Sequence, residues 1–225
     1  MAPTNTFNIT AEPGTDIWRK PPTTDVFNAP IALPPRGKDA AAPLRHSGPL
    51  TSFLSARISL NFTPEEQYDQ GGILLSFRRR QRADAVPPSS RPPPPKWIKS
   101  GIEFYNGHPR LSTVSCDNWA DWSVADLSAT AQEAKAAQEI GWTTVSIEKD
   151  KDGNGTGLWV YQVLDGEGTS GGERKVPLRE ICWVFGQERL EDWDVEVHAM
   201  AARPEKQAKG GLVVEFSGLE VKWDS

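Results

Sequence analysis

The chain has 225 residues, with 30 acidic and 25 basic side chains and a formal net charge of −5 at pH 7. A nucleic-acid partner requires an excess of basic side chains that displaces counterions from phosphates, so this balance argues against one. No apolar stretch approaches the ~18 residues that cross a bilayer, so no membrane-spanning segment is predicted, and no membrane partner is expected. The length suits one large β-sandwich, a class that commonly takes ~200–250 residues.

Strand-like segments with intervening turns begin in the first quarter of the chain. Apolar and polar residues alternate in Leu54–Phe62, which predicts a strand, and Gly71–Phe77 is a second, more apolar one. Lys99–Tyr105 and Leu111–Cys116 flank the dipeptide Asn106-Gly107, which is a strong hairpin signal. The last two segments are therefore predicted to pair as a hairpin.

The second half of the chain continues this pattern. Further strands are predicted at Thr143–Glu148, Leu158–Leu164, Cys182–Gln187, Asp194–Ala201 and Leu212–Trp223. The first two are joined by a connector rich in Asp, Asn and Gly, which favours a hairpin. One helix is a candidate, at the alanine-rich segment Ala129–Glu139. Many short strands with little helix predict a sandwich or a barrel.

Two segments carry loop composition. Residues 33–48 are rich in Pro, Ala and Gly, and residues 83–95 end in four consecutive prolines. Proline removes a backbone donor and fixes φ, so the 83–95 segment cannot join the interior of a sheet. Neither separates two blocks of different composition, and we therefore expect residues 1–225 to form one domain with these segments as insertions.

The N-terminal residues lack a basic segment followed by an apolar core. We therefore expect no signal peptide and a cytoplasmic location. In such a compartment Cys116 and Cys182 are expected to be free, buried thiols and not a disulfide.

Several ordered stretches resemble those of one known family. They are Gly14–Lys20, Tyr68–Leu74, Trp97–Phe104, Asn106-Gly107 and Asp121–Ser123. On these stretches the chain, from about residue 6 to residue 223, resembles the regulation-of-enolase family (domain of unknown function 1349) of the concanavalin A-like lectin/glucanase superfamily. The resemblance implies a jelly-roll sandwich of two antiparallel sheets, one of them concave, in a cytosolic protein of a fungus or bacterium. It implies no established activity, and residues 125–141 are longer than the family pattern.

The segment Trp97–Phe104 is the most informative for function. Successive side chains of a strand point to opposite faces, so Trp97, Lys99 and Glu103 share one face. An aromatic, a basic and an acidic side chain on one face of a concave sheet would form a suitable binding surface for a polar ligand. A solvated Lys–Glu pair on an exposed strand is the alternative.

Other aromatic and polar residues near strand ends could converge on the same cleft. The expected ligand-binding residues are Asp16, Trp18, Arg19, Tyr68, Gln70, Trp97, Lys99, Glu103, Asp121 and Trp122. Aspartate also caps turns, and tryptophan also packs into the open ends of β-sandwiches. Structural roles are therefore the alternative for the members of this set.

Catalytic residues are less clearly indicated, and Glu103 and Lys99 are the candidates. Glycoside hydrolysis needs two facing carboxyl groups, and Glu103 has no second carboxylate at a neighbouring same-face position of its strand. The acidic ladder Asp192, Asp194 and Glu196 is more typical of a solvated strand face. Whether the protein is an enzyme stays open at this point.

No cofactor or metal ion is predicted. Asp150, Asp152 and Asn154 match the first half of a calcium loop, but position 12 is Tyr161 and the flanks are strand-like, so a hairpin turn is favoured. No histidine lies at metal-ligand spacing, and no glycine-rich phosphate loop precedes a helix.

Three functions follow from these features. The favoured one is a lectin-like binding or regulatory module for a carbohydrate or a small polar metabolite. The alternatives are an enzyme that uses the same groove, such as a glycoside hydrolase, a lyase or a natural-product cyclase, and a scaffold for a protein partner that binds the proline-rich segment.

Overall fold

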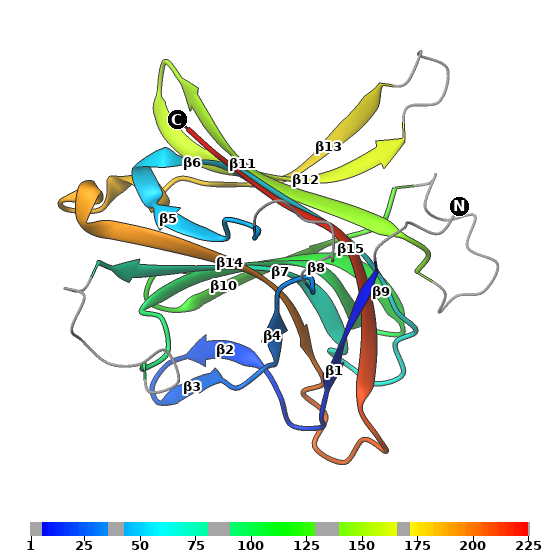
Figure 1. Cartoon of the computed structure of the whole chain (residues 1–225). Coiled ribbons are helices and arrows are strands. Elements are labelled where there is room, and N and C mark those ends of the chain that lie inside the picture. Colours follow the sequence, from blue (N-terminus) through cyan, green and yellow to red (C-terminus); the bar gives the residue numbers. More distant parts are fainter. Residues whose placement is uncertain (1–5, 36–42, 81–90, 129–139, 166–171, 225) are drawn as a thin grey trace.

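The computed structural model describes residues 6–35, 43–80, 91–128, 140–165 and 172–224. The helix predicted at Ala129–Glu139, most of the 83–95 segment and part of the 33–48 segment lie outside these residues. Two antiparallel sheets pack face to face (Figure 1). Within the described residues, helical structure consists of short 3-10 turns at Leu50–Ser52, Val184–Gly186 and Leu190–Asp192. This architecture confirms the expected all-β, concanavalin A-like jelly-roll sandwich.

The first sheet has six strands and contains both ends of the described chain. Its order is β1 (Phe7–Ala11), β15 (Leu212–Trp223), β6 (Phe53–Asn61), β11 (Thr143–Asp152), β12 (Gly155–Asp165) and β13 (Glu173–Ile181). Most neighbours in this order are distant in sequence, whereas β11, β12 and β13 form a meander.

The second sheet carries the segment singled out from the sequence at its centre. Its order is β10 (Ala120–Ala125), β9 (His108–Cys116), β8 (Lys96–Tyr105), β7 (Gln70–Arg79), β14 (Trp193–Ala202) and β4 (Ile31–Ala32), and β5 (Ser47–Pro49) also pairs with β14. A separate hairpin, β2 (Ile17–Lys20) with β3 (Thr24–Phe27), lies on the side of this seven-stranded sheet that faces away from the six-stranded sheet (Figure 1).

Most predicted strands are confirmed, some with longer bounds. The connector expected at 149–157 is a tight turn, because β11 and β12 continue their pairing as far as Asp152 and Gly155. The strand expected at Cys182–Gln187 is wrong. The strand is β13, just before it, and Val184–Gly186 forms a 3-10 turn that buries Val184. A charged edge strand that contains Pro177 has no apolar alternation from which it could be recognised.

The main core lies between the two sheets. It is built from alternating side chains such as Ile58, Phe216, Leu75 and Val197, all of them fully buried. Strand β14 illustrates the pattern, because Val195, Val197 and Ala199 enter this core. Burial of such side chains stabilises the sandwich by about 1.5–3 kcal/mol for each large residue.

A second, smaller apolar cluster lies on the outer face of the seven-stranded sheet. It joins Leu74, Trp97, Val114 and Met200 from four strands of the sheet to Ile17 of the hairpin. Strands β7 and β8 are therefore buried on both faces, which explains why they lack a simple polar alternation. The hairpin covers only part of this outer face.

Candidate functional site

Two hollows in the described part of the chain have volumes of ≈ 750 Å³ and ≈ 610 Å³, and the smaller of these two contains most of the predicted site residues. It lies on the outer face of the seven-stranded sheet, and we call it the outer-face pocket. Its lining residues are Asp16, Trp18, Lys20, Gln67, Tyr68, Gln70, Lys99, Glu103, Trp122, Pro204 and Glu205. They come from the β2 region, the start of β7, β8, β10 and the loop after β14.

Lys99 lies at the base of the pocket in a network of hydrogen bonds. Its Nζ donates to Oε1 of Gln70 at 2.8 Å and lies 3.2 Å from Oδ1 of Asp16. The Lys99 side chain is 6% exposed and that of Asp16 is 25% exposed. A buried ammonium group needs such partners, because its desolvation is otherwise costly. The positive charge of Lys99 is thus balanced inside the pocket.

Glu103 lies on the same face of β8 and is also buried. Its Oε2 accepts hydrogen bonds from Oγ of Ser112 at 2.6 Å and from Nε1 of Trp122 at 2.8 Å. Burial raises the pKa of Glu103 above its ordinary value of 4.5, against the opposing effects of Lys99 and of these two hydrogen bonds. Glu103 is therefore poised to carry a proton more readily than an exposed carboxylate.

Aromatic side chains form one side of the pocket. Tyr68 lies 5.9 Å from Tyr105 and 6.3 Å from Trp122 between ring centroids, and Tyr105 meets Trp122 edge to face at 4.8 Å. Tyr68 is 39% exposed and has a left-handed backbone conformation with φ of 69°. Such a conformation is strained for a bulky residue and needs support from its surroundings.

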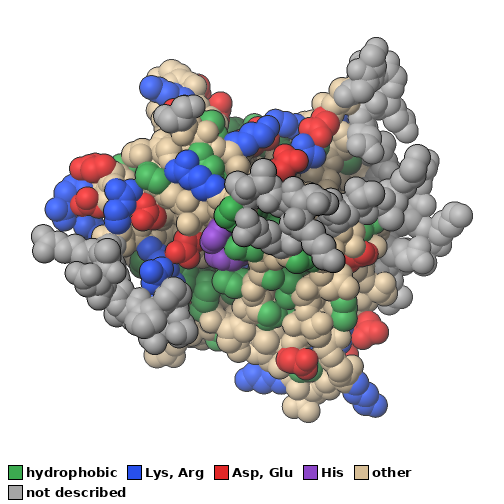
Figure 2. All heavy atoms as spheres, in the orientation of Figure 1, with side chains coloured by type: hydrophobic (Ala, Val, Ile, Leu, Met, Phe, Trp, Pro, Cys, Tyr) green, Lys and Arg blue, Asp and Glu red, His purple; other side chains and the backbone are tan. Residues whose placement is uncertain are grey.

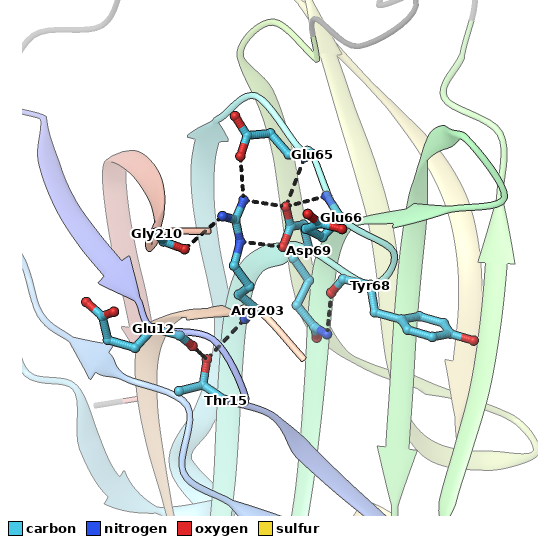
Figure 3. Close-up of polar contacts among 9 residues, drawn as sticks. Glu12, Thr15, Glu65, Glu66, Tyr68, Asp69, Arg203 and Gly210 are labelled. Carbon is cyan, nitrogen blue, oxygen red and sulfur yellow. Dashed lines mark hydrogen bonds and ion pairs between the residues drawn. The ribbon is translucent and has the colours of Figure 1, made fainter. Parts of the chain in front are cut away.

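That support is a buried ion pair between Arg203 and Asp69, next to Tyr68 in the chain (Figure 3). The guanidinium of Arg203 also donates to the carbonyl oxygen of Gly210, and the backbone NH of Arg203 donates to Oγ1 of Thr15. The network in Figure 3 therefore ties together the β6–β7 loop, the segment before β2 and the loop after β14. Each of these segments supplies residues to the outer-face pocket.

Seven of the predicted ligand-binding residues line this one pocket. They are Asp16, Trp18, Tyr68, Gln70, Lys99, Glu103 and Trp122. The cross-strand pairing of Gln70 with Glu103 and the position of β10 at the edge of the same sheet bring together segments that are far apart in sequence.

The other three predicted residues are not among the pocket lining. Trp97 is 1% exposed because the β2–β3 hairpin covers it within the second apolar cluster. Arg19 is bound to Asp25 and to the carbonyl oxygens of Pro94 and Pro95, so it anchors the hairpin. Asp121 pairs with Arg179, because neighbours in a strand point to opposite faces and Trp122 takes the pocket side.

Some residues of the site were not predicted from the sequence. Lys20, Gln67, Pro204 and Glu205 line the pocket, and Ser112 and Arg203 hold its residues in place. For Ser112 a signal was available, because the hairpin at Asn106-Gly107 pairs β9 with β8 and brings Ser112 close to Glu103. No local pattern indicated that the loop after β14 reaches the pocket.

The other sequence candidates lie elsewhere. The acidic ladder is ion-paired, with Asp194 bound to Arg80 and Glu196 to Arg91. The carboxylate of Asp152 accepts the backbone NH groups of Asn154 and Gly155, so it caps its own turn. No group of three or more His, Cys, Asp or Glu side chains placed to hold a metal ion is found in the described part of the chain.

The two cysteines are both free, but only Cys116 is buried. The expectation that both are buried is wrong for Cys182, because this residue follows edge strand β13, where the chain turns away from the sheet. On the face seen in Figure 2, Lys and Arg side chains are interspersed with Asp and Glu side chains. Among the described residues there is no helix with the length and apolarity needed to cross a membrane.

Comparisons with known proteins agree with this fold. The chain is 34% identical over 216 residues to an uncharacterised protein of Emericella nidulans, covering 96% of this chain and 86% of the relative. It is 29% identical over 98 residues to "Regulation of enolase protein 1" of Saccharomyces cerevisiae, covering 44% of this chain and 38% of that protein. A crystal structure of a functionally unknown protein from Saccharomyces cerevisiae superposes with a TM-score of 0.52 at 21% identity, covering 100% of this chain and 91% of that one.

A family model described as "Protein of unknown function (DUF1349)" matches residues 2–223, almost the whole chain. The resemblance seen in the ordered sequence stretches is thereby confirmed. The chain belongs to the DUF1349 family of proteins of unknown function.

Proposed function

We propose that this protein is a binding or regulatory module that takes a carbohydrate or a small polar metabolite into the outer-face pocket. The observation that carries the proposal is the convergence of polar and aromatic side chains from five distant segments on one pocket of ≈ 610 Å³. Ligand sites in proteins are typically hollows of this size, with a few fixed polar groups among apolar and aromatic walls. The Lys99 and Glu103 networks supply fixed polar groups, and Trp18, Tyr68 and Trp122 supply the walls.

Binding is favoured over catalysis by the partners of Glu103. Its hydrogen-bond donors within the described residues are Ser112 and Trp122, and neither titrates near neutral pH. A general acid or base is usually accompanied by a second titratable group in hydrogen-bond contact with it or with the reacting atoms. In this pocket the Nζ group of Lys99 is instead held by Asp16 and Gln70.

Catalysis in the same pocket is the second candidate, and the raised pKa of Glu103 favours it. A buried carboxyl group with a raised pKa can act as a general acid near neutral pH. In this function Glu103 would donate the proton and Lys99 would orient the substrate. Glu103→Gln should then abolish turnover of any substrate that binds, and unchanged turnover in this variant would exclude the role.

The proposed location is the cytoplasm. The two free cysteines support it, because secreted proteins commonly pair their cysteines whereas reducing compartments keep thiols free. Fractionation of cells that express a tagged full-length chain tests this, and recovery of the protein from the culture medium would contradict it.

The binding function is tested by thermal shift followed by titration calorimetry against a panel of neutral and charged oligosaccharides and central-carbon metabolites. Trp122→Ala removes an aromatic wall of the pocket, and Trp119→Ala removes a 47% exposed tryptophan outside it as the matched control. We expect Trp122→Ala to weaken binding about tenfold, because a stacked aromatic contact contributes about 0.5–1.5 kcal/mol beyond its buried area. Equal affinity in the wild type and in Trp122→Ala contradicts the assignment of this pocket.

A further inference from the structure

We infer that the ligand of the outer-face pocket is an uncharged, polyhydroxylated ring, such as a neutral sugar unit, and not a phosphorylated or carboxylated metabolite. This inference rests on the proposed binding function and narrows the class of ligand. It follows from how the charges of the pocket are already paired and from which hydrogen-bonding atoms the pocket leaves for a ligand.

Anion binding would need a basic side chain that is free to meet the anion. Lys99 is committed, because Asp16 balances its charge at 3.2 Å and Gln70 takes one of its hydrogen bonds at 2.8 Å. The other basic residue of the pocket, Lys20, is exposed at the rim, where water screens its charge. An anion that entered the pocket would therefore meet a Lys99 ammonium group whose positive charge is already offset by the carboxylate of Asp16.

Carboxylates outnumber ammonium groups around the pocket. Asp16, Glu103 and Glu205 line it together with Lys20 and Lys99. A phosphate or carboxylate group placed against Glu103 would meet a like charge or would need Glu103 to stay protonated, and like charges inside a site of low polarity repel strongly. The charge distribution thus disfavours anionic ligands and leaves a neutral ligand unaffected.

The atoms left for a ligand are a mixture of donors and acceptors. Among the described residues, the hydrogen bonds to Asp16 and Glu103 use Oδ1 and Oε2, and the second oxygen of each carboxyl group has no protein donor. Lys99 has three N–H bonds, of which two are used, and the Nε2 amide of Gln70 has a second N–H beside the one bound to Tyr68. A hydroxyl group both donates and accepts, so a ring with several hydroxyls matches this mixture, whereas a phosphate only accepts.

The aromatic side chains of the pocket also suit a sugar ring. The rings of Trp18, Tyr68 and Trp122 offer apolar faces beside the polar base of the pocket. A sugar ring carries hydroxyls around its edge and C–H bonds on its faces, so it can stack on an aromatic ring while its edge bonds to the base. A small phosphorylated metabolite without such a ring would leave the aromatic walls without a partner.

The test compares neutral ligands with anionic relatives of the same sugar. Calorimetry compares trigalacturonic acid with its neutral methyl ester, and glucose 6-phosphate with glucose. We expect the neutral member of at least one pair to bind about tenfold or more tightly than its charged partner, as one uncompensated like-charge contact requires. Tighter binding of the charged members throughout overturns this inference but leaves the binding function intact. Absence of binding by all of these sugars also overturns this inference, whereas the binding function is contradicted only when the wider panel of metabolites fails to bind as well.

A charge-neutral variant shows whether the discrimination arises in this pocket. Glu103→Gln keeps an oxygen that accepts from Ser112 and Trp122 and removes the negative charge. We expect the ratio of the affinity for trigalacturonic acid to that for its methyl ester to rise about fivefold or more in this variant. Glu220→Gln, an exposed site on the six-stranded sheet, serves as the matched control and should leave the ratio unchanged. An unchanged ratio in Glu103→Gln overturns the inference.

Discussion

Arg203 and Asp69 form a buried two-point ion pair, with Nε of Arg203 2.9 Å from Oδ1 of Asp69 and Nη2 2.8 Å from Oδ2. The two side chains are 2% and 0% exposed. The backbone NH groups of Glu65 and Glu66 also donate to Oδ2 of Asp69, so the remaining acceptor capacity of the carboxylate is used. This pair joins two loops that carry Tyr68 and Pro204 to the outer-face pocket.

Removing one partner of this pair should be strongly destabilising. Arg203→Ala leaves a buried carboxylate without its counter-charge, and we expect the free energy of unfolding to fall by about 3–5 kcal/mol. The double variant Arg203→Ala with Asp69→Ala should lose clearly less than the sum of the two single variants, because neither charge is then left alone. Urea-induced unfolding of the four proteins measures this.

An exposed ion pair provides the control. Arg189 and Asp192 lie 3.4 Å apart with side chains that are 69% and 45% exposed, so Arg189→Ala should change the free energy of unfolding by no more than about 0.5 kcal/mol. Similar losses in Arg203→Ala and Arg189→Ala would show that the buried pair has no special role.

The strands that form the core could largely be predicted, because their alternation records which face is buried. Leu212–Trp223 has the predicted bounds, and the strand predicted at Asp194–Ala201 is β14, in which Val195, Val197 and Ala199 enter the core. Strand β13 was missed because a charged edge strand needs no apolar face. The β2–β3 hairpin was missed because short strands that cover a sheet leave no long periodic pattern.

The site was predicted in part, for a related reason. Alternation places Trp97, Lys99 and Glu103 on one face of β8, as the structure has them, but it does not indicate what covers that face. The hairpin covers Trp97 and leaves Lys99 and Glu103 beside the pocket. Arg203 could not be predicted, because it is separated from Asp69 by 134 positions and only the sheet order brings them together.

Gly101 is expected to tolerate no side chain. A Cβ at this position would lie 2.0 Å from the carbonyl oxygen of Gly71 on the neighbouring strand, and backbone atoms cannot move aside without disrupting the pairing of β7 with β8. Gly101→Ala should therefore lower the free energy of unfolding by about 3 kcal/mol or more, or prevent folding. Gly153→Ala, where a Cβ meets no atom within 4 Å, should cost little. Equal thermal stability of these two variants would contradict the close packing of β7 and β8.

His198 should make the protein less stable in mild acid. Burial, together with the neighbouring His46, lowers the pKa of His198 from 6.5 to about 4. The imidazole of His198 therefore takes up a proton at a higher pH in the unfolded chain than in the folded chain. The stability contributed by neutral His198 is fully present above pH 6.5, and up to about 3 kcal/mol is lost as the pH falls towards 4.

This loss is measured by urea unfolding between pH 4 and pH 7. His198→Gln removes the titrating group and should flatten the acid limb of the stability curve, whereas the exposed His108, replaced by Gln, should leave the limb as in the wild type. A curve of unchanged slope in His198→Gln would refute this explanation of the acid sensitivity.

Glu103 should make the folded protein less stable as the pH rises, which is the opposite of the effect of His198. Because burial raises its pKa above 4.5, the folded state keeps this proton at a pH where the unfolded chain has released it. Its contribution to stability therefore falls as the pH rises from 4.5 through the raised pKa. Glu103→Gln removes that loss, so the stability of the variant relative to the wild type should increase between pH 4 and pH 7. Glu220→Gln is the control, and a difference that does not change with pH would argue against a buried, proton-retaining Glu103.

The most direct test of the binding pocket follows the indole NH signals of the nine tryptophans during titration with the neutral oligosaccharides. Single Trp→Phe variants assign the signals in the nitrogen-15 spectrum of the full chain. We expect the signals of Trp18 and Trp122, which line the pocket, to shift together along one saturation curve, while those of Trp159 and Trp223 on the six-stranded sheet stay in place. Shifts confined to Trp159 and Trp223, or no shift at millimolar concentrations of every probe, would contradict it.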